Sequence, residues 1–278
     1  MNESDLTHDA FLGGLLHLWQ PRKGYRAGVD PVLLAATIPA VSGQRVLELG
    51  CGVGAAILCL GARVAGLSLT GVEREAIYAD LAKRNGADIL EVVQADIAAL
   101  PLMLRQRQFD HVLVNPPYWR RDASIAAGDP MREAALGEQT PLLLWIETCA
   151  KRLAPKGLLH VIHRAARLPD ILAALPHDMG GIEVLPIAAR EGRAAERVIV
   201  RARKSGRADF RLHAPLILHR GDVHVDGDQY TQPIRDALRL GAALSFLSRL
   251  KHLFTTMGVM LQGGVTWDSD HASLNLHF

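Results

Sequence analysis

Residues 46–54 read Val-Leu-Glu-Leu-Gly-Cys-Gly-Val-Gly, an apolar run that ends in three glycines at alternate positions. The apolar half is typical of a buried β-strand. The glycine half lets the backbone turn tightly and lets a ligand approach without meeting a Cβ atom. A helical pattern follows at once, so its free backbone amides would face whatever binds at the turn. The stretch therefore predicts a strand, a ligand-binding turn and a helix in succession.

Short β-rich runs alternate with helical patterns between residues 45 and 203, and several runs are almost wholly apolar, as in a sheet covered on both faces. The predicted strands are Arg45–Leu49, Ser68–Glu73, Ile89–Gln94, Phe109–Val114, Gly157–His163, Ile182–Ile187 and Glu196–Arg203. The predicted helices are Gly54–Val64, Glu75–Asn85, Leu142–Leu153 and Leu168–Leu175. This alternation predicts an α/β fold with a doubly wound, mostly parallel sheet of seven strands. The last two strands are joined by a link too short for a parallel crossover, so the last strand should be antiparallel.

Length and composition limit the remaining possibilities. A chain of 278 residues that is 49% hydrophobic suits one full α/β domain with appendages. The net charge is only +2, so any attraction to nucleic acid must come from a local patch. Three cysteines without zinc or C-x-x-C spacing indicate a reducing compartment and no disulfide framework, and we expect no metal site. With no signal-peptide pattern and no apolar run near the ~20 residues of a membrane span, we expect a cytoplasmic protein.

Acidic residues accompany the glycine turn. Glu73 ends the second strand, where a carboxylate can accept both ribose hydroxyls of a nucleoside, and Asp96 follows the third strand, where it can receive an adenine amino group. Glu48 lies inside the first strand, and the spacing is G-x-G-x-G; both details resemble S-adenosylmethionine-dependent methyltransferases more than dinucleotide-binding enzymes. Structural roles stay open: Glu73 could serve a helix dipole, Asp96 could cap a helix, and Glu48 could bond only to backbone.

The second motif is Asn115-Pro116-Pro117-Tyr118, at the end of the fourth predicted strand. A conjugated amine or amide nitrogen is a poor nucleophile, and two acceptors on its hydrogens would favour a pyramidal nitrogen with a free lone pair. The Asn115 side-chain oxygen and the Pro116 carbonyl can supply them, the proline pair stiffens the backbone, and Tyr118 offers a face for a planar substrate. A rigid strand-to-loop exit is the alternative.

Together with the segment Gly24–Ala35 and residues 162–165, Ile-His-Arg-Ala, these motifs resemble the bacterial tRNA1(Val) adenine-37 N6-methyltransferases, from about Phe11 to Ala243. The resemblance implies a Rossmann-like class I methyltransferase, S-adenosylmethionine as cofactor, and methylation of adenine N6 next to a tRNA anticodon. It assigns the target amine to Asn115, Pro116, Pro117 and Tyr118. It assigns the cofactor to Asp30, Glu48, Gly50, Cys51, Gly52, Gly54, Glu73, Arg74, Asp96, Ile97 and Asn115.

Basic residues point to RNA. Residues 190–211 hold eight basic side chains against three acidic ones, and Arg197, Arg201 and Arg203 share one strand face by alternation. Such a patch could hold phosphates, with Trp119, Arg120 and Arg121 adding contacts beside the target site. A solvated face that protects a sheet edge is the alternative.

The motifs fix the type of nitrogen better than the substrate. Asn-Pro-Pro-Tyr is shared with protein-glutamine N5-methyltransferases, a close variant occurs in rRNA guanine-N2 enzymes, and an inactive RNA-binding scaffold is a further possibility. Upstream, we expect Asp30 to cap a helix with Pro31 in its first turn. We expect four parts: an N-terminal segment packed on the cofactor site (1–44), the methyltransferase core (45–203), a hairpin and helix (204–250), and a tail of unknown role (251–278). The sequence does not fix the oligomeric state, although it favours a monomer.

Overall fold

The computed structural model describes residues 3–120, 137–138, 140–221, 229–246, 266–267 and 274–275. Residues 1–246 form one compact unit, and residues 247–278 form a second. In the second unit, strand β14 (Thr266–Trp267) pairs antiparallel with β15 (Leu274–Asn275). Within the described ranges, no helix has both the length and the apolar character that crossing a membrane requires.

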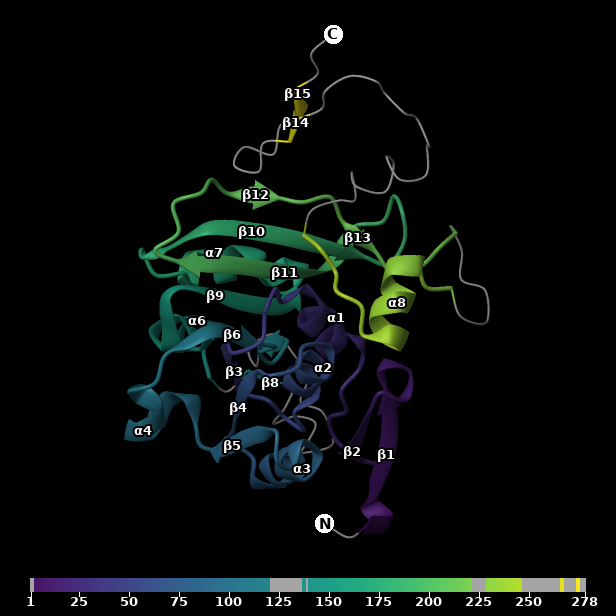
Figure 1. The fold of residues 1–278 in the computed structure, drawn as a ribbon, viewed down its shortest axis with the longest axis vertical. Coiled ribbons are helices and arrows are strands. Elements are labelled where there is room, and N and C mark those ends of the chain that lie inside the picture. The colour runs from purple at the N-terminus through teal and green to yellow at the C-terminus, as the bar shows by residue number, and fades with distance from the viewer. Residues whose placement is uncertain are drawn as a thin grey trace. The chain divides into compact units, whose positions relative to one another are not determined.

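The first unit is built on one large sheet with the strand order β12-β10-β11-β9-β6-β3-β4-β5, and β13 also pairs with β10 (Figure 1). Its strands are β3 (Arg45–Leu49), β4 (Ser68–Glu73), β5 (Leu90–Gln94), β6 (Phe109–Val114), β9 (Leu153–Arg164), β10 (Met179–Ala188), β11 (Ala195–Lys204), β12 (Arg211–Leu212) and β13 (Leu216–Ile217). Among these described strands, only β11 runs antiparallel to its neighbours, β9 and β10. The doubly wound sheet and its antiparallel last strand are therefore confirmed. The short strands β12 and β13 both pair with β10 and extend the sheet along that edge.

Helices cover both faces of the sheet, and each face has its own core. In β3, Val46 packs in one core while Leu47 and Leu49 pack in the other, so the strand is buried on both faces of the sheet. The Val46 side is covered by α1 (Val29–Thr37), α2 (Ala55–Arg63), α3 (Ala76–Gly86) and α8 (Gln232–Leu240). The Leu47 side is covered by α4 (Leu102–Arg105), α6 (Leu142–Arg152) and α7 (Leu168–Ala174).

The N-terminal residues form a hairpin that the sequence pattern does not predict. Strand β1 (Leu6–Phe11) pairs antiparallel with β2 (Leu16–Pro21), and the 3₁₀ turn η2 (Leu12–Gly14) joins them. The hairpin lies beside α3 and α8 rather than in the large sheet (Figure 1). Two-residue strands β7 (Trp119–Arg120) and β8 (Gly137–Glu138) form a separate parallel pair.

Candidate active site

A cavity of about 420 Å³ lies where the carboxyl ends of β3, β4, β5 and β6 meet. The chain turns to opposite sides of β3 to reach β4 and β6, and ligands of open α/β sheets bind at such a switch point. The volume falls within the range of cofactor pockets. Residues 50–53, 73–75, 95–97 and 115–118, which end or follow these strands, all contribute to the wall. The two sequence motifs therefore face one common space.

The glycine turn has the geometry that its sequence predicts. Gly50, Gly52 and Gly54 all have positive φ angles, of 67°, 55° and 85°, which side chains rarely tolerate. A Cβ atom on Gly50 would lie 2.8 Å from the Trp145 ring, so that glycine is required by packing. A Cβ atom on Gly52 would meet no atom of the described part of the chain within 4 Å, because Gly52 borders the open cavity. Gly54 precedes α2 and does not line the cavity, so its role is in the turn itself.

The predicted nucleoside acids line the cavity. Each Glu73 carboxylate oxygen accepts one backbone amide, from Gly52 at 2.9 Å and from Glu75 at 2.9 Å. A carboxylate offers about four acceptor positions, so both oxygens can also take a ribose hydroxyl. Asp96 caps the 3₁₀ turn η3 (Ile97–Ala99) by accepting the Ala98 amide at 2.8 Å, which confirms the capping role. Its cofactor role stays a prediction.

Glu48 anchors the turn from inside the sheet. The carboxylate is 3% exposed and accepts the Ile57 amide, in the first turn of α2, at 3.0 Å. The backbone role considered for this acid is therefore present, although Glu48 also borders the cavity. Burial raises the Glu48 pKa to about 8, and the negative charge of Glu73 adds to the shift. At neutral pH the group carries a proton.

Substituting Glu48 with glutamine should change how stability depends on pH. The folded pKa of about 8 lies above the ordinary value of 4.5, so the folded protein holds a proton that the unfolded chain has lost. The free energy of unfolding therefore decreases as the pH rises from 4.5 to about 8, by up to about 1 kcal/mol per pH unit. Glu48→Gln should lose this part of the slope, as measured by chemical denaturation at pH 5 to 9 without ligand. The control is Glu191→Gln on an exposed loop; equal slopes in Glu48→Gln and the wild type would refute the assignment.

The Asn-Pro-Pro-Tyr segment lines the cavity from the end of β6. The Asn115 Oδ1 atom is buried and, among the described residues, has no hydrogen-bond partner. A buried acceptor without a partner costs about 1–3 kcal/mol, so this oxygen suits a donor brought by a ligand. The Tyr118 hydroxyl donates to Asp30 Oδ2 at 2.7 Å. Asp30 is the second residue of α1 and makes no side-chain cap, so the prediction that it caps this helix is wrong.

The predicted phosphate-binding arginines differ in their surroundings. Arg197 borders the cavity and donates to Asp30 Oδ2 at 2.8 Å, while Arg201 pairs with Glu183 at 2.7 Å. Arg203 is exposed, and no described group pairs with it. A role in RNA binding stays a prediction for all three. The side chains of Trp119 and Arg120, and the whole of Arg121, lie outside the described residues.

Several lining residues were not named individually from the sequence, although residues 25–29 belong to the N-terminal segment that was expected to pack on the cofactor site. Residues 25–29 form one side of the cavity, and Tyr78, Thr140 and Trp145 reach it from other elements. The Trp145 Nε1 donor is buried without a partner among the described residues. No spacing in the sequence could have placed these side chains, because Tyr78 comes from α3 and Trp145 from α6, and only the completed fold brings them together.

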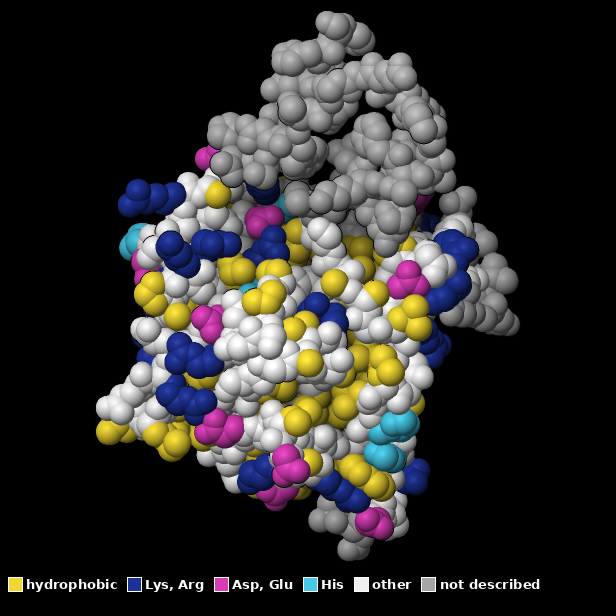
Figure 2. All heavy atoms as spheres, viewed as in Figure 1, with side chains coloured by type: hydrophobic (Ala, Val, Ile, Leu, Met, Phe, Trp, Pro, Cys, Tyr) yellow, Lys and Arg dark blue, Asp and Glu magenta, His cyan; other side chains and the backbone are white. Residues whose placement is uncertain are grey.

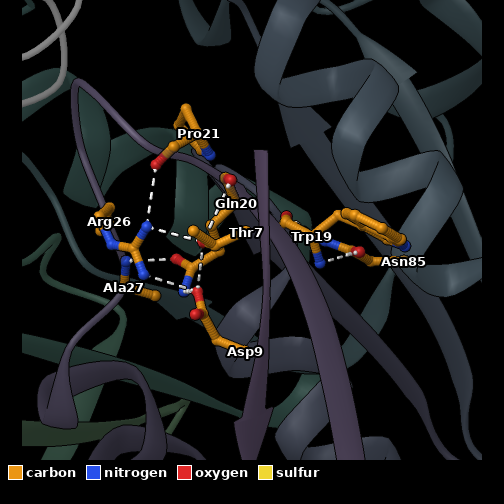
Figure 3. A network of polar contacts seen from close by, with 8 residues as sticks. All are labelled: Thr7, Asp9, Trp19, Gln20, Pro21, Arg26, Ala27 and Asn85. Carbon is orange, nitrogen blue, oxygen red and sulfur yellow. Dashed lines mark hydrogen bonds and ion pairs between the residues drawn. The ribbon is translucent and has the colours of Figure 1, made fainter. Parts of the chain in front are cut away.

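The hairpin supports this side of the cavity through a polar network (Figure 3). Arg26 donates to Asp9 and Thr7, both at 2.7 Å, and Gln20 accepts the Ala27 amide at 2.8 Å. Gln20 also donates to Asp9 at 2.8 Å, so one carboxylate joins both strands to the wall. The network fixes the backbone that leads into α1.

The site as a whole fits S-adenosylmethionine. The open space at Gly52 can receive the cofactor close to the backbone, and Glu73 retains acceptor positions for ribose hydroxyls. Besides the protonated Glu48, acidic groups at 30, 73, 75 and 96 line the cavity, which suits a cationic sulfonium group. Among the described residues, no cluster of three or more potential ligands could hold a metal ion.

Comparison with known proteins agrees with this geometry. The family model described as "Methyltransferase small domain" matches residues 27–175. A Porphyromonas gingivalis protein named tRNA1(Val) (adenine(37)-N6)-methyltransferase is 33% identical over 158 residues, which are 52% of this chain and 61% of that protein. A Dickeya chrysanthemi protein of the same name is 26% identical over 68% of this chain and 77% of its own.

Among solved structures, the crystal structure of "a predicted O-methyltransferase, protein Atu636 from Agrobacterium tumefaciens" has a TM-score of 0.64 and 28% identity. The similarity covers 78% of this chain and 98% of that one. The match to the Porphyromonas relative spans about three-fifths of its length. The fold is thus that of class I methyltransferases.

Proposed function

The chain belongs to the methyltransferase small domain family, whose enzymes use S-adenosylmethionine, and we propose that it methylates the N6 amine of an adenine in tRNA. The observation that carries this proposal is the position of Asn115: its side-chain oxygen, which has no partner within the described ranges, and the glycine turn line one cavity. An acceptor there serves a nitrogen with hydrogens to donate. A deprotonated oxygen nucleophile has no hydrogen to donate, so the Asn115 acceptor would not help to bind it.

The chain's own residues would orient and activate the amine. The bound cofactor supplies an electrophilic methyl group. The Asn115 oxygen and the Pro116 carbonyl accept the two amine hydrogens, which stabilises the pyramidal nitrogen of the transition state more than the planar amine of the substrate. Burial, the nearby Asp30 charge and the hydrogen bond to Asp30 raise the Tyr118 pKa. The phenol therefore stays protonated, so Tyr118 acts as a wall and not as a base.

Two observations support tRNA as the substrate. The curated relatives carry the name tRNA1(Val) (adenine(37)-N6)-methyltransferase, which supports adenine 37 as the target. The segment 203–212 also presents Arg203, Arg207 and Arg211 to solvent without a partner among the described residues, with Phe210 53% exposed between them. Figure 2 shows Lys and Arg side chains over the region of β12 and the start of β10, where this segment lies. Phosphate contacts and base stacking need groups of these kinds.

The salt dependence of RNA binding tests this surface. Replacing Arg207 and Arg211 with alanine should weaken tRNA binding and reduce the slope of log K against log salt by roughly 1.4–1.8, the loss of two phosphate contacts. Cofactor affinity should not change. The charge-matched control replaces Lys83 and Lys151, which lie in ion pairs within helices. An equal loss of slope in both double variants would argue against a specific surface.

The deciding experiment is transfer of a labelled methyl group from S-adenosylmethionine to tRNA, followed by digestion to nucleosides. N6-methyladenosine is expected, and a transcript with guanine at position 37 should take up no label. Transfer to rRNA guanine or to a protein glutamine would show that tRNA is not the substrate, but it would still support methyl transfer to a nitrogen. Cofactor binding without transfer to any of these would favour a binding scaffold. A tRNA substrate would also place the protein in the cytoplasm.

A further inference from the structure

Three segments far apart in the sequence meet at one carboxylate oxygen on the cavity wall. Asp30 Oδ2 accepts the Tyr118 hydroxyl at 2.7 Å and the Arg197 Nε–H at 2.8 Å. These partners lie 88 and 167 residues away from Asp30. The side chains of Asp30 and Arg197 are only 13% and 32% exposed, and all three residues line the cavity. A charge-assisted pair in such partial burial is stronger than a surface ion pair.

The hydroxyl bond determines how the Tyr118 ring is held. At its backbone end, Tyr118 follows Pro116 and Pro117, which restrict the chain but leave the side-chain torsions free. At its far end, the hydroxyl is bonded to Asp30. The ring also lies 5.2 Å from the His163 ring, tilted by 43°. Fixing both ends gives the ring one orientation toward the cavity before a substrate binds.

Arg197 in turn determines the state of Asp30. The carboxylate is buried, and its other oxygen, Oδ1, has no partner among the described residues. The start of α1 gives Asp30 some support through the helix dipole. Without the guanidinium, however, a buried charge would keep only the phenol as a direct partner, and an incompletely paired buried charge is costly enough to move its side chain. The orientation of Tyr118 therefore depends on Arg197 through the carboxylate oxygen that the two residues share.

From this geometry we propose that Arg197 is a positioning residue: acting through Asp30, it holds Tyr118 as the wall of the target-amine slot. The inference rests on the proposed function, because the slot is the one that Asn115 defines. It gives Arg197 a role within the active site in place of phosphate binding. Asp30 becomes the link between β11, which carries Arg197, and the Asn-Pro-Pro-Tyr segment.

A double-mutant cycle tests the coupling. Arg197→Met removes the charge and Tyr118→Phe removes the hydroxyl while keeping the ring. Each should lower kcat/KM for tRNA about tenfold, the effect of one hydrogen bond to a charged group. The double variant should lose about the same tenfold rather than about a hundredfold, because both changes break one chain of contacts. Arg197→Lys should recover part of the loss, and the affinity for S-adenosylhomocysteine should stay within about twofold throughout.

A second measurement does not depend on activity. The chain contains four tyrosines, so 3-fluorotyrosine labelling gives few ¹⁹F resonances, and Tyr118→Phe assigns one of them. That resonance should shift in Arg197→Met and Asp30→Asn. It should not shift in Arg107→Met, a control in which an arginine bound to Glu91 and Thr70 is lost away from the cavity.

The outcomes separate the two proposals. An inactive wild type whose Tyr118 resonance shifts in Arg197→Met would overturn the tRNA substrate and keep the contact chain. An active wild type with multiplicative losses, or with an unmoved resonance, would overturn the role of Arg197. A large loss of cofactor affinity in Arg197→Met would also overturn it, since Arg197 would then bind the cofactor directly.

Discussion

Replacing Asn115 with alanine should lower kcat for methyl transfer by about two to three orders of magnitude, the range seen when one preorganised polar group is removed from a transition state. The Asn115 oxygen is buried and unpartnered among the described residues, so the folded protein already bears the cost of presenting it. Alanine removes that acceptor and the preference for a pyramidal nitrogen. The affinity for S-adenosylhomocysteine should change little, because Glu73 and the glycine turn remain intact.

Single-turnover methylation of tRNA, with cofactor affinity measured by calorimetry, separates the two effects. Asn115→Asp is the informative companion, because it keeps an acceptor oxygen but adds a charge beside the sulfonium. It should retain more activity than alanine and bind the cofactor at least as well. Unchanged turnover in Asn115→Ala would remove this residue from the mechanism. A parallel loss of turnover and cofactor affinity would make it a cofactor-binding residue instead.

Local patterns predicted the parts of the fold that local chemistry determines. Apolar runs identified all seven main strands of the sheet, and the three glycines marked the turn because only glycine adopts their positive φ angles without strain. The site at the carboxyl ends of β3–β6 follows from those strands and the rule for open sheets. Boundaries were less accurate: β9 begins at Leu153, four residues before the predicted start at Gly157.

The hairpin was missed because the inward face of its strands mixes polar and apolar residues. Phe11, Leu16 and Leu18 pack on the core, while Thr7, Asp9 and Gln20 lie on the same face and bond within the polar network, so burial does not appear as a regular alternation of apolar residues. Buried polar groups are stable only when each finds a partner. Here the partners come from a different segment, which a local pattern cannot reveal.

Asp30 illustrates the same limit within the site. The sequence Gly-Val-Asp-Pro suggested a capping acid, which would bond the amides two or three positions ahead. In the structure the helix already begins at Val29, so Asp30 lies inside its first turn, and Tyr118 and Arg197 donate to the carboxylate instead. Long-range partners of this kind decide the role of a charged residue, and they depend on the completed fold.

Gly52→Ala should abolish most cofactor binding with only a small loss of stability. Gly52 has φ of 55°, so alanine costs about 1 kcal/mol in backbone strain. No atom of the described residues lies within 4 Å of the added methyl group, so the fold can accept it. The methyl group would instead occupy the cavity where the backbone must approach the ligand, and we expect about a hundredfold loss of affinity for S-adenosylhomocysteine. Calorimetric titration and chemical denaturation measure the two quantities separately.

Gly192→Ala is the matched control. Gly192 has φ of 70°, again with nothing within 4 Å of the position that a Cβ atom would take, but it lies on an exposed loop away from the cavity. Both variants should lose the same small amount of stability, and only Gly52→Ala should lose affinity. Equal affinities in the two variants would mean that the cofactor does not approach the turn at Gly52. A large loss of stability in Gly52→Ala alone would mean that the glycine serves the fold, since strain common to both positions cannot explain a difference between them.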